Sequence, residues 1–222
     1  MTTETVNYRA AKKYFGDVAA SYEDRRTKEG RWQIEQDIVA KYVRDLPTGA
    51  EIADVPFGTG RFAPFYIERK LKVFGADISP DMIAVAKEKI AESDGFRIEV
   101  SAAEALPLPD RSVDYLICHR YIKWLPDLPA LERVMSEFAR VTRREMFIQL
   151  KLRVKRKKGI LSELINIIRR PRPKVDDGKA RTHQFSASEF EKVVRSNGFQ
   201  IKNIAPHSEI SRGVAYYTIT RV

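Results

Sequence analysis

Short apolar runs alternate with amphipathic stretches from Glu51 onward, and this alternation constrains the fold more than any other feature of the chain. It predicts βαβ units, in which helices that cross a face of the sheet join parallel strands. We expect strands at residues 51–55, 72–77, 97–101, 113–119 and 146–150, and helices at 61–70, from 79 onward and at 127–141. This part of the chain therefore predicts a doubly wound, mostly parallel sheet.

The two flanking parts of the chain follow other patterns. Residues 6–45 are expected to form two helices before the first strand. Ser186 and Glu189 make a capping-box pattern, which predicts a helix that begins there. Two further β runs, 199–204 and 214–222, are joined by only nine residues, whereas a parallel crossover needs about a dozen or more. These last two strands are therefore expected to pair in the antiparallel direction.

The composition limits the class of protein. With 222 residues, 43% of them hydrophobic and 32% charged, the chain can bury a packed core without disulfide bonds. Cys118, in an apolar run, is the single cysteine, and one cysteine cannot form an internal disulfide. No spacing typical of metal ligands stands out, so we expect no bound metal. No apolar run reaches the roughly 18 residues of a spanning helix, and the first residues lack the apolar region of a secretory signal. We therefore expect a cytoplasmic protein.

The formal net charge of +10 is concentrated in one segment. Residues 151–183 hold twelve of the 40 lysines and arginines but only three of the 30 acidic residues. Leu161, Leu164, Ile165 and Ile168 stand at helical spacing there, which predicts a short basic amphipathic helix. Such a helix can make peripheral contact with an anionic membrane, cap a substrate, or be a solvated face. Nucleic acid is the less favoured partner, because the segment has no aromatic side chain for base stacking.

A glycine turn follows the first expected strand. Gly58, Gly60 and Ala63 fit the pattern G-x-G-x-x-G/A, in which the backbone of a tight turn approaches a ligand closely. Asp77 ends the next expected strand, 19 residues after Gly58, where a carboxylate can accept two hydrogen bonds from the hydroxyls of a ribose. The spacing indicates a ligand that contains adenosine and by itself leaves the class of that ligand open.

Four segments resemble the motifs of the class I S-adenosylmethionine (SAM)-dependent methyltransferases. They are Asp54–Arg61 (DVPFGTGR), Gly75–Met82 (GADISPDM), Ala103–Asp110 (AEALPLPD) and Val113–Asp127, which begins VDY and ends WLPD. The resemblance spans about residues 14–150 and is closest to the methyltransferase type 11 branch, which contains the ubiquinone and menaquinone biosynthesis methyltransferases. Two positions depart from the family. Pro56 stands where the first glycine is usual, and Ala102 stands where an aspartate commonly reaches the adenine.

The resemblance implies an α/β, Rossmann-like, doubly wound sheet of seven strands, mostly parallel and with the last strand antiparallel. It implies a single domain over residues 1–222, with an N-terminal helical lid at 1–48 and the basic insert at 151–183 after the fifth strand. The implied activity is SAM-dependent methyl transfer to a small-molecule or lipid-like acceptor. Two alternatives stay open: an RNA or protein methyltransferase that uses the basic insert, and a non-catalytic basic binding module on the same fold.

The resemblance also implies roles for single residues. Those implied to bind SAM are Asp54, Phe57, Gly58, Thr59, Gly60, Asp77, Ile78, Met82, Ala103, Glu104 and His119. His119 and Lys123 follow the fourth strand and are expected to be catalytic, since an imidazole or an amine there can accept a proton from the acceptor. The candidates for substrate binding are Tyr22, Arg120 and Tyr121. Structural alternatives remain: Asp54 can cap the turn, Lys123 can form a surface ion pair, and Tyr22 can belong to a packed stripe.

Overall fold

The computed structural model describes residues 16, 27, 29–91, 95–152, 184–207 and 213–222. Its strands, in chain order, are β1 (Glu51–Asp54), β2 (Lys72–Asp77), β3 (Phe96–Val100), β4 (Val113–Cys118), β5 (Thr142–Lys151), β6 (Phe199–Pro206) and β7 (Val214–Arg221). They form a seven-stranded sheet in the order β3-β2-β1-β4-β5-β7-β6. Strands β1 to β5 pair in parallel, whereas β7 is antiparallel to both of its neighbours. The predicted fold class is confirmed, and the reversed strand lies between β5 and β6.

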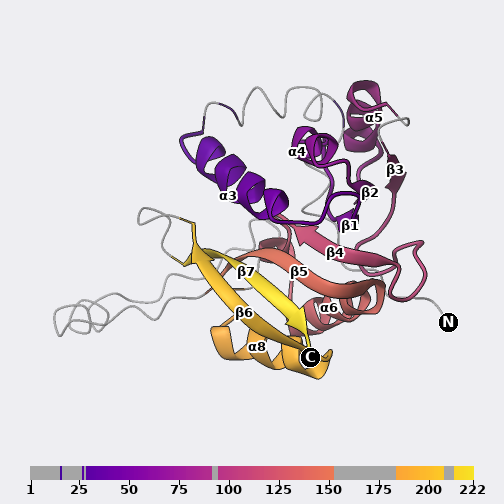
Figure 1. The fold of residues 1–222 in the computed structure, drawn as a ribbon. Helices are drawn as coiled ribbons and strands as arrows, with labels where there is room; N and C mark the ends of the chain where they lie inside the picture. Colours follow the sequence, from indigo (N-terminus) through magenta and orange to yellow (C-terminus); the bar gives the residue numbers. More distant parts are fainter. Residues whose placement is uncertain (1–15, 17–26, 28, 92–94, 153–183, 208–212) are drawn as a thin grey trace.

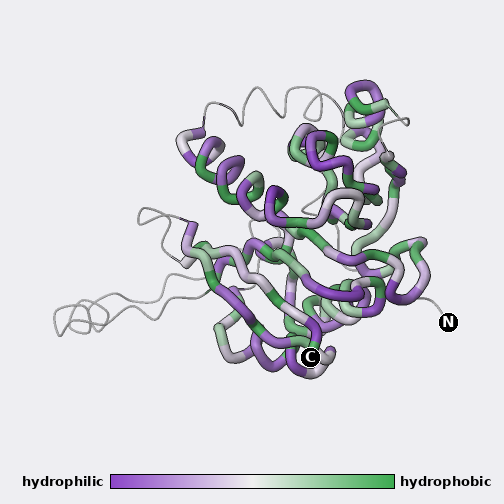
Figure 2. The backbone as a smooth tube through the Cα atoms, in the orientation of Figure 1, coloured by the Kyte–Doolittle hydropathy of each residue, from purple (hydrophilic) through white to green (hydrophobic). Residues whose placement is uncertain are grey.

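Helices cover both faces of this sheet (Figure 1). The helices on one face are α3 (Trp32–Arg44), α4 (Ala63–Glu68) and α5 (Pro80–Lys89), and those on the other are α6 (Leu128–Val141) and α8 (Ala187–Ser196). A short 3-10 helix, η4 (Ile122–Trp124), follows β4. Neighbouring strand residues point to opposite faces, so Leu116 belongs to the hydrophobic cluster under α6 and α8, and Ile117 to that under α3, α4 and α5. Figure 2 shows hydrophilic and hydrophobic residues alternating along α3, as expected for a helix with one buried face.

Side-chain caps set the starts of three helices. Ser79 caps α5 and Asp127 caps α6, each accepting a hydrogen bond from a backbone N–H, at 3.3 and 2.9 Å. Ser186 and Glu189 form both hydrogen bonds of a capping box at the start of α8. These side chains satisfy N–H groups that lack a partner within the helix. The helix starts predicted at these residues are confirmed.

Two elements differ most from their predicted bounds, while the other strands agree within two residues at each end. The helix expected at 61–70 is reduced to α4, because a turn continues through Phe62 and Lys70 takes a φ of 53° after the helix ends. The fifth strand begins at Thr142, directly after α6, rather than at Met146. Its first residues include Arg143, and a charged residue of this kind does not by itself indicate a strand. The Arg143 side chain forms an ion pair with Asp114 at the surface. Strand pairing with β4 and β7 overrides the weak local propensity.

The described residues test the N-terminal and insert predictions in part. The second of the two helices expected before the first strand is α3, which is confirmed. The first of these helices lies outside the described residues, and so do Tyr22 and the basic insert beyond Leu152.

Candidate functional site

Residues expected to act together lie at one edge of the sheet. Asp54 ends β1, Asp77 ends β2, and His119 directly follows β4. Because these strands are parallel, their carboxyl ends share an edge, which is where open α/β sheets bind ligands. In the sheet, β1 lies between β2 and β4. The residues that follow these three strands are therefore neighbours at this edge.

The turn between β1 and α4 permits close approach of a ligand. Gly58 and Gly60 have φ values of 58° and 76°, which residues with a side chain rarely adopt. A Cβ on Gly58 would meet no described atom within 4 Å, whereas one on Gly60 would lie 2.5 Å from Ile90 Cδ1. Open space therefore lies in front of Gly58. The ring of Phe57 packs against Gly75, so its side chain belongs to the core.

Asp77 links this turn to the end of β2. One carboxylate oxygen accepts a hydrogen bond from the N–H of Gly58 and the other from the N–H of Ser79, each at 2.9 Å. Burial raises the pKa of Asp77, although these donors oppose the rise. Ile78 is half-buried next to it, and Met82 is buried in the first turn of α5. The carboxylate is thus fixed in place beside the glycine turn.

Asp54 is buried, and one of its two carboxylate oxygens accepts a hydrogen bond within the described residues. Its Oδ2 accepts a hydrogen bond from the hydroxyl of Tyr66 at 2.9 Å, while Oδ1 has no hydrogen-bond partner among the described residues. Burial raises the pKa of Asp54 to about 8 despite the Tyr66 bond, and the charge of Asp77 adds to the rise. A buried polar atom without a partner is uncommon in folded proteins. A donor or cation placed at Oδ1 would complete this group and lower its pKa.

The loop of the third motif is held from α6. Ala103 is buried in the core cluster and Glu104 is half-buried, both in a turn after β3. The N–H of Leu106 donates to Glu137 at 2.6 Å, and Arg140 donates to the carbonyl of Leu106 at 3.2 Å. Glu137 and Arg140 also bond each other at 2.7 Å. This ion pair therefore fixes the loop at the same edge of the sheet, beside β2.

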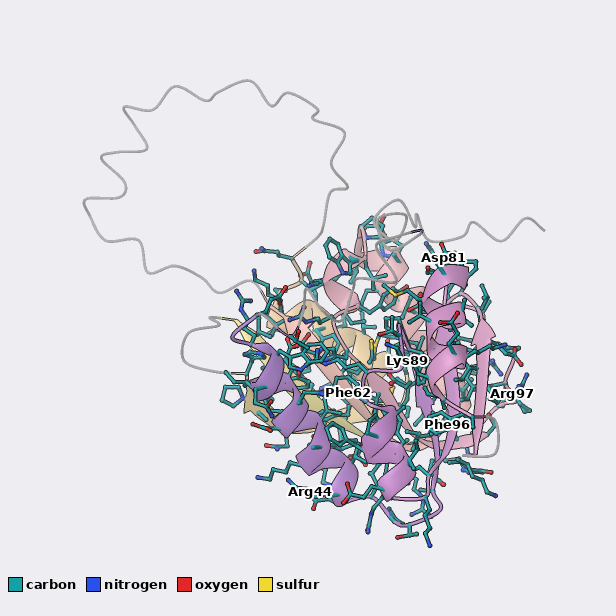
Figure 3. All side chains as sticks on the ribbon, turned by 90° about the horizontal axis from the view of Figure 1, so that it is seen from above. Arg44, Phe62, Asp81, Lys89, Phe96 and Arg97 are labelled. Carbon is teal, nitrogen blue, oxygen red and sulfur yellow. The ribbon has the colours of Figure 1, made fainter. Side chains whose placement is uncertain are left out.

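His119 has protein partners on both ring nitrogens. The Gln149 amide donates to the hydroxyl of Tyr216 at 3.2 Å, which leaves that hydroxyl to donate to His119 Nδ1, also at 3.2 Å. This assigns the ring proton to Nε2, which lies 3.3 Å from Glu35 Oε2. The ring of Phe62, labelled near the centre of the molecule in Figure 3, packs nearly perpendicular to the imidazole with a centroid distance of 5.1 Å. Proton transfer from an acceptor to His119 would require one of these bonds to break.

Glu35 of α3 is the centre of a buried polar cluster. We call it the Glu35 cluster, with members Glu35, Arg61, His119, Arg120, Gln149, His207 and Tyr216. The Glu35 side chain is 2% exposed, and both Arg61 and Arg120 approach it to 2.8 Å. The Arg61 guanidinium also lies 3.6 Å from the ring centroid of Trp32, a cation–π contact. Residues of α3, β5 and β7 thus meet residues of the glycine turn and residues that follow β4 and β6.

The cluster fixes the charges of its members. Burial alone would raise the pKa of Glu35, but the hydrogen bond from His119 and the charges around it hold that pKa well below its usual range. Burial lowers the pKa of His119 to about 4 and also lowers the pKa of His207. Glu35 is therefore ionised and His119 neutral at neutral pH. The two arginines supply the positive charge that a buried carboxylate needs.

The other predicted residues lie after β4, within the glycine turn or outside the described parts. Lys123 is half-buried on η4, and its ammonium lies 4.9 Å from the ring centroid of Trp124. Tyr121 is partly buried against the core cluster under α6. Gly16 donates its N–H to Asp81 at 2.8 Å, which places this N-terminal residue at the start of α5. Thr59 is buried within the glycine turn.

Sequence reasoning missed the Glu35 cluster except for His119 and Arg120. One signal was present, because Glu35 occupies the same helix face as Val39 and Val43, which are both buried. A carboxylate at spacing i, i+4, i+8 with two buried valines indicates a buried ion pair. Gln149 and Tyr216 offered no such signal, since they lie in strands far apart in the sequence.

The described residues show neither a metal cluster nor a membrane span. No group of three or more His, Cys, Asp or Glu side chains within them could hold a metal ion. None of the described helices combines the length and the apolar character needed to cross a bilayer.

Comparison with known sequences points to one family. Residues 53–148 match the family described as a methyltransferase domain. The malonyl-[acyl-carrier protein] O-methyltransferase of Pectobacterium atrosepticum is 29% identical over 185 residues, which are 83% of this chain and 66% of that protein. The phosphatidylethanolamine N-methyltransferase of Cereibacter sphaeroides is 34% identical over 100 residues, 43% of this chain and 47% of that protein. The chain thus spans about half to two thirds of the length of these relatives.

Solved structures share the fold. Magnesium protoporphyrin IX methyltransferase from Synechocystis, crystallised with bound S-adenosylhomocysteine (SAH), superposes with a TM-score of 0.72 at 17% sequence identity. The match covers 97% of this chain and 100% of that one. At this identity the likeness concerns the arrangement of strands and helices.

Proposed function

Because this chain belongs to the class I SAM-dependent methyltransferases, we propose that it transfers a methyl group from SAM to a small-molecule or lipid-like acceptor. One arrangement carries the proposal: Asp54, Asp77 and the open side of Gly58 lie at a single edge of the sheet. SAM, when bound, supplies a methyl group on a sulfonium that is already activated toward a nucleophile.

The described residues fit this cofactor. The unpartnered Oδ1 of Asp54 would accept a hydrogen bond from its ammonium group, and the open space at Gly58 leaves room for its methionine part. Asp77 would accept from the ribose hydroxyls, since each carboxylate oxygen can take a second hydrogen bond. The residues proposed to complete the site are Phe57 through its backbone, Thr59, Gly60, Ile78, Met82, Ala103, Glu104 and His119.

On the acceptor side, the main contribution we propose is positioning. Well-oriented reactants gain roughly 7–11 kcal/mol over free ones, so an activated donor needs little further chemistry. His119 is proposed to shape the site, because both of its nitrogens are bonded to protein groups. Lys123 is proposed as the proton acceptor in its neutral amine form, and Tyr22, Arg120 and Tyr121 as contacts of the acceptor.

The names of the relatives support a small or lipid-like acceptor. Malonyl-[acyl-carrier protein] and phosphatidylethanolamine are the molecules named in the activities of two of them. A cytoplasmic location and peripheral contact of residues 151–183 with an anionic membrane surface are part of this proposal. Both proposals rest on the sequence. The insert beyond Leu152 lies outside the described residues.

Cofactor binding is tested first, by Asp77→Ala. Hydrogen bonds to a charged group contribute roughly 1.5–3 kcal/mol, so the affinity for SAM should fall about ten-fold or more. Isothermal titration calorimetry measures this affinity. Asp45→Ala, which removes an exposed carboxylate at the far end of α3, is the matched control and should bind SAM normally. Unchanged affinity in Asp77→Ala would remove Asp77 from the site.

The activity itself is tested with SAM that carries a labelled methyl group. The protein is incubated with fractionated cell extract, and label is counted in lipid, small molecules, RNA and protein. We expect label in the lipid or small-molecule fraction. Label in RNA or protein would overturn the proposed acceptor class, and a protein that binds SAM but labels no fraction would be a binding module on this fold.

A further inference from the structure

Arg120 contacts two carboxylates of different character. Its guanidinium lies 2.8 Å from Glu35 Oε1, on a side chain that is 2% exposed, and 3.2 Å from Glu29 Oε2, on a side chain that is 41% exposed. Arg120 itself is 14% exposed. One end of this interaction is therefore buried within the fold, and the other faces solvent.

Among the described residues, the buried part of the Glu35 cluster holds two guanidiniums and one carboxylate. Arg61 and Arg120 both bond Glu35, and His119 is neutral, so two guanidiniums share one buried carboxylate in the described part of the chain. Glu29 supplies further negative charge, but from the surface. A planar guanidinium held in this way matches the two oxygens of a carboxylate or a phosphate.

The backbone of Arg120 is unusual in the same place. Its φ of 58° is in the left-handed region, which is uncommon for a residue other than glycine. The Arg120 N–H donates to Gln149 Oε1 at 3.2 Å, so the cluster helps to hold this conformation. Such residues gather at functional sites, where the surrounding structure maintains them. Arg120 also stands two residues after the end of β4, at the edge where the proposed site lies.

We propose that Arg120 binds an acidic group of the acceptor, a carboxylate or a phosphate, in the place that Glu29 occupies in this structure. This inference rests on the proposed function, because it states which acceptors the site would take. Glu35 keeps its bonds to both arginines and acts as a positioning residue. Displacing Glu29 breaks one exposed ion pair, which contributes little, whereas displacing Glu35 would leave two buried guanidiniums without their carboxylate.

Binding of simple probes tests this site. The protein is saturated with SAH, and the affinities of hexanoate, hexyl phosphate and hexanol are measured by ligand-observed NMR. At least one acidic probe should bind about ten-fold or more tightly than hexanol, and the two acidic arms show which acid the site takes. Arg120→Gln should remove this preference. Glu29→Gln should strengthen binding of the acidic probe about two- to five-fold, because the competing carboxylate is gone.

Two further variants guard against indirect effects. Arg120→Lys keeps the charge without the planar fork, so it should retain part of the preference in a folded protein. Glu191→Gln breaks an ion pair that is more exposed and remote from the site, with Arg195 at 2.8 Å on α8, and should change no affinity. If SAH binds but the acidic probes bind no better than hexanol, or Glu29→Gln weakens them, the inference is wrong and the proposed function stands. Failure of SAH to bind would overturn both.

Discussion

Asp54 lowers the stability of the folded protein when its carboxylate is ionised. In an unfolded chain its pKa is near 3.8, and in the folded protein burial raises that pKa to about 8. Between these values the folded protein holds a proton that the unfolded chain has released. The free energy of unfolding therefore falls as pH rises through this window, and the loss is complete above about pH 8. The buried carboxylate is nevertheless kept at the edge where a cation would meet it.

We predict opposite effects of Asp54→Asn on stability and on binding. The amide cannot ionise, so the melting temperature of the variant relative to the parent should increase from pH 5 to pH 9. Its affinity for SAM should fall, because an amide attracts an ammonium group less than a carboxylate does. Thermal unfolding over this pH range and calorimetry at pH 8 measure the two effects. A stability difference that is the same at every pH would show that Asp54 does not titrate as stated.

Single residues were predictable from the sequence where their partners are local. Ser79 caps α5 and Asp77 meets Gly58 because strand, turn and helix follow one another along the chain. Glu35 and Tyr216 were not predictable in the same way, since their contacts depend on how distant elements come together. The ring of Phe57 packs against Gly75, a contact that no local pattern in the sequence indicated.

At the scale of elements, α3 is attached to the sheet by two kinds of contact. Near its start, Glu35 bonds two arginines, and the Trp32 carbonyl accepts from Arg61 at 2.8 Å. Near its end, Tyr42 stacks on Phe147 of β5 with ring centroids 4.0 Å apart. The first contact depends on ionised groups, whereas the second includes ring stacking that pH does not change, beside a hydrogen bond from the Tyr42 hydroxyl to Glu145 at 3.0 Å. Acid should therefore release the start of α3 before its end.

Hydrogen exchange should detect this release. Below the unfolded pKa of about 6.5 the unfolded imidazole binds a proton, but buried His119, with a pKa of about 4, does not, so stability falls as pH decreases from 6.5 to 4. Protonation of unfolded Glu35 adds to the loss below about 4.5. Protection factors in the first half of α3 should decrease over this range. Those of α8, which docks through Phe190 and its apolar neighbours, should hold. Equal loss in both helices would contradict the prediction.

The glycine turn offers a second prediction. Gly58→Ala and Gly60→Ala both place a side chain at positive φ, which costs about 1 kcal/mol. Gly60→Ala should lower the melting temperature further, because its Cβ would lie 2.5 Å from Ile90 Cδ1. Adding Ile90→Val, which removes that carbon, should recover part of the loss. Gly58→Ala should instead act on SAM affinity. No recovery in the double variant would mean that the contact with Ile90 is not the cause.

The whole molecule has two hydrophobic clusters that share one sheet. Leu131 is fully buried in the cluster under α6 and α8, and Leu71 is 1% exposed in the cluster under α3, α4 and α5. Because neighbouring residues of the same strands enter both clusters, we expect them to unfold together. Leu131→Ala and Leu71→Ala should each lower the free energy of unfolding by about 2–5 kcal/mol. Urea unfolding followed by tryptophan fluorescence and circular dichroism should give coincident curves in both variants, and separated curves would indicate independent halves.

The order of the last two strands could not be read from local patterns. Nine connecting residues predicted an antiparallel pair, which is confirmed, but they did not say which strand joins β5. The difference lies in burial. Tyr216 and Ile219 of β7 are buried, whereas Lys202 and Asn203 of β6 are exposed, and such polar side chains suit the outer strand of a sheet. The adjacent polar residues Lys202 and Asn203 in the middle of β6 could have indicated the edge, since the middle of β7 has no such pair.

The insertion of β7 between β5 and β6 has a consequence for the newly made chain. Strand β5 leaves the ribosome before β6 and β7, so one side of it must wait with open backbone groups until β7 arrives. An exposed edge of this kind is a template for pairing with other chains. The apolar centre of β5, Met146 to Ile148, is flanked by Arg143, Arg144 and Lys151, and flanking charges of this kind discourage such pairing. These charges would protect the nascent protein from aggregation during translation.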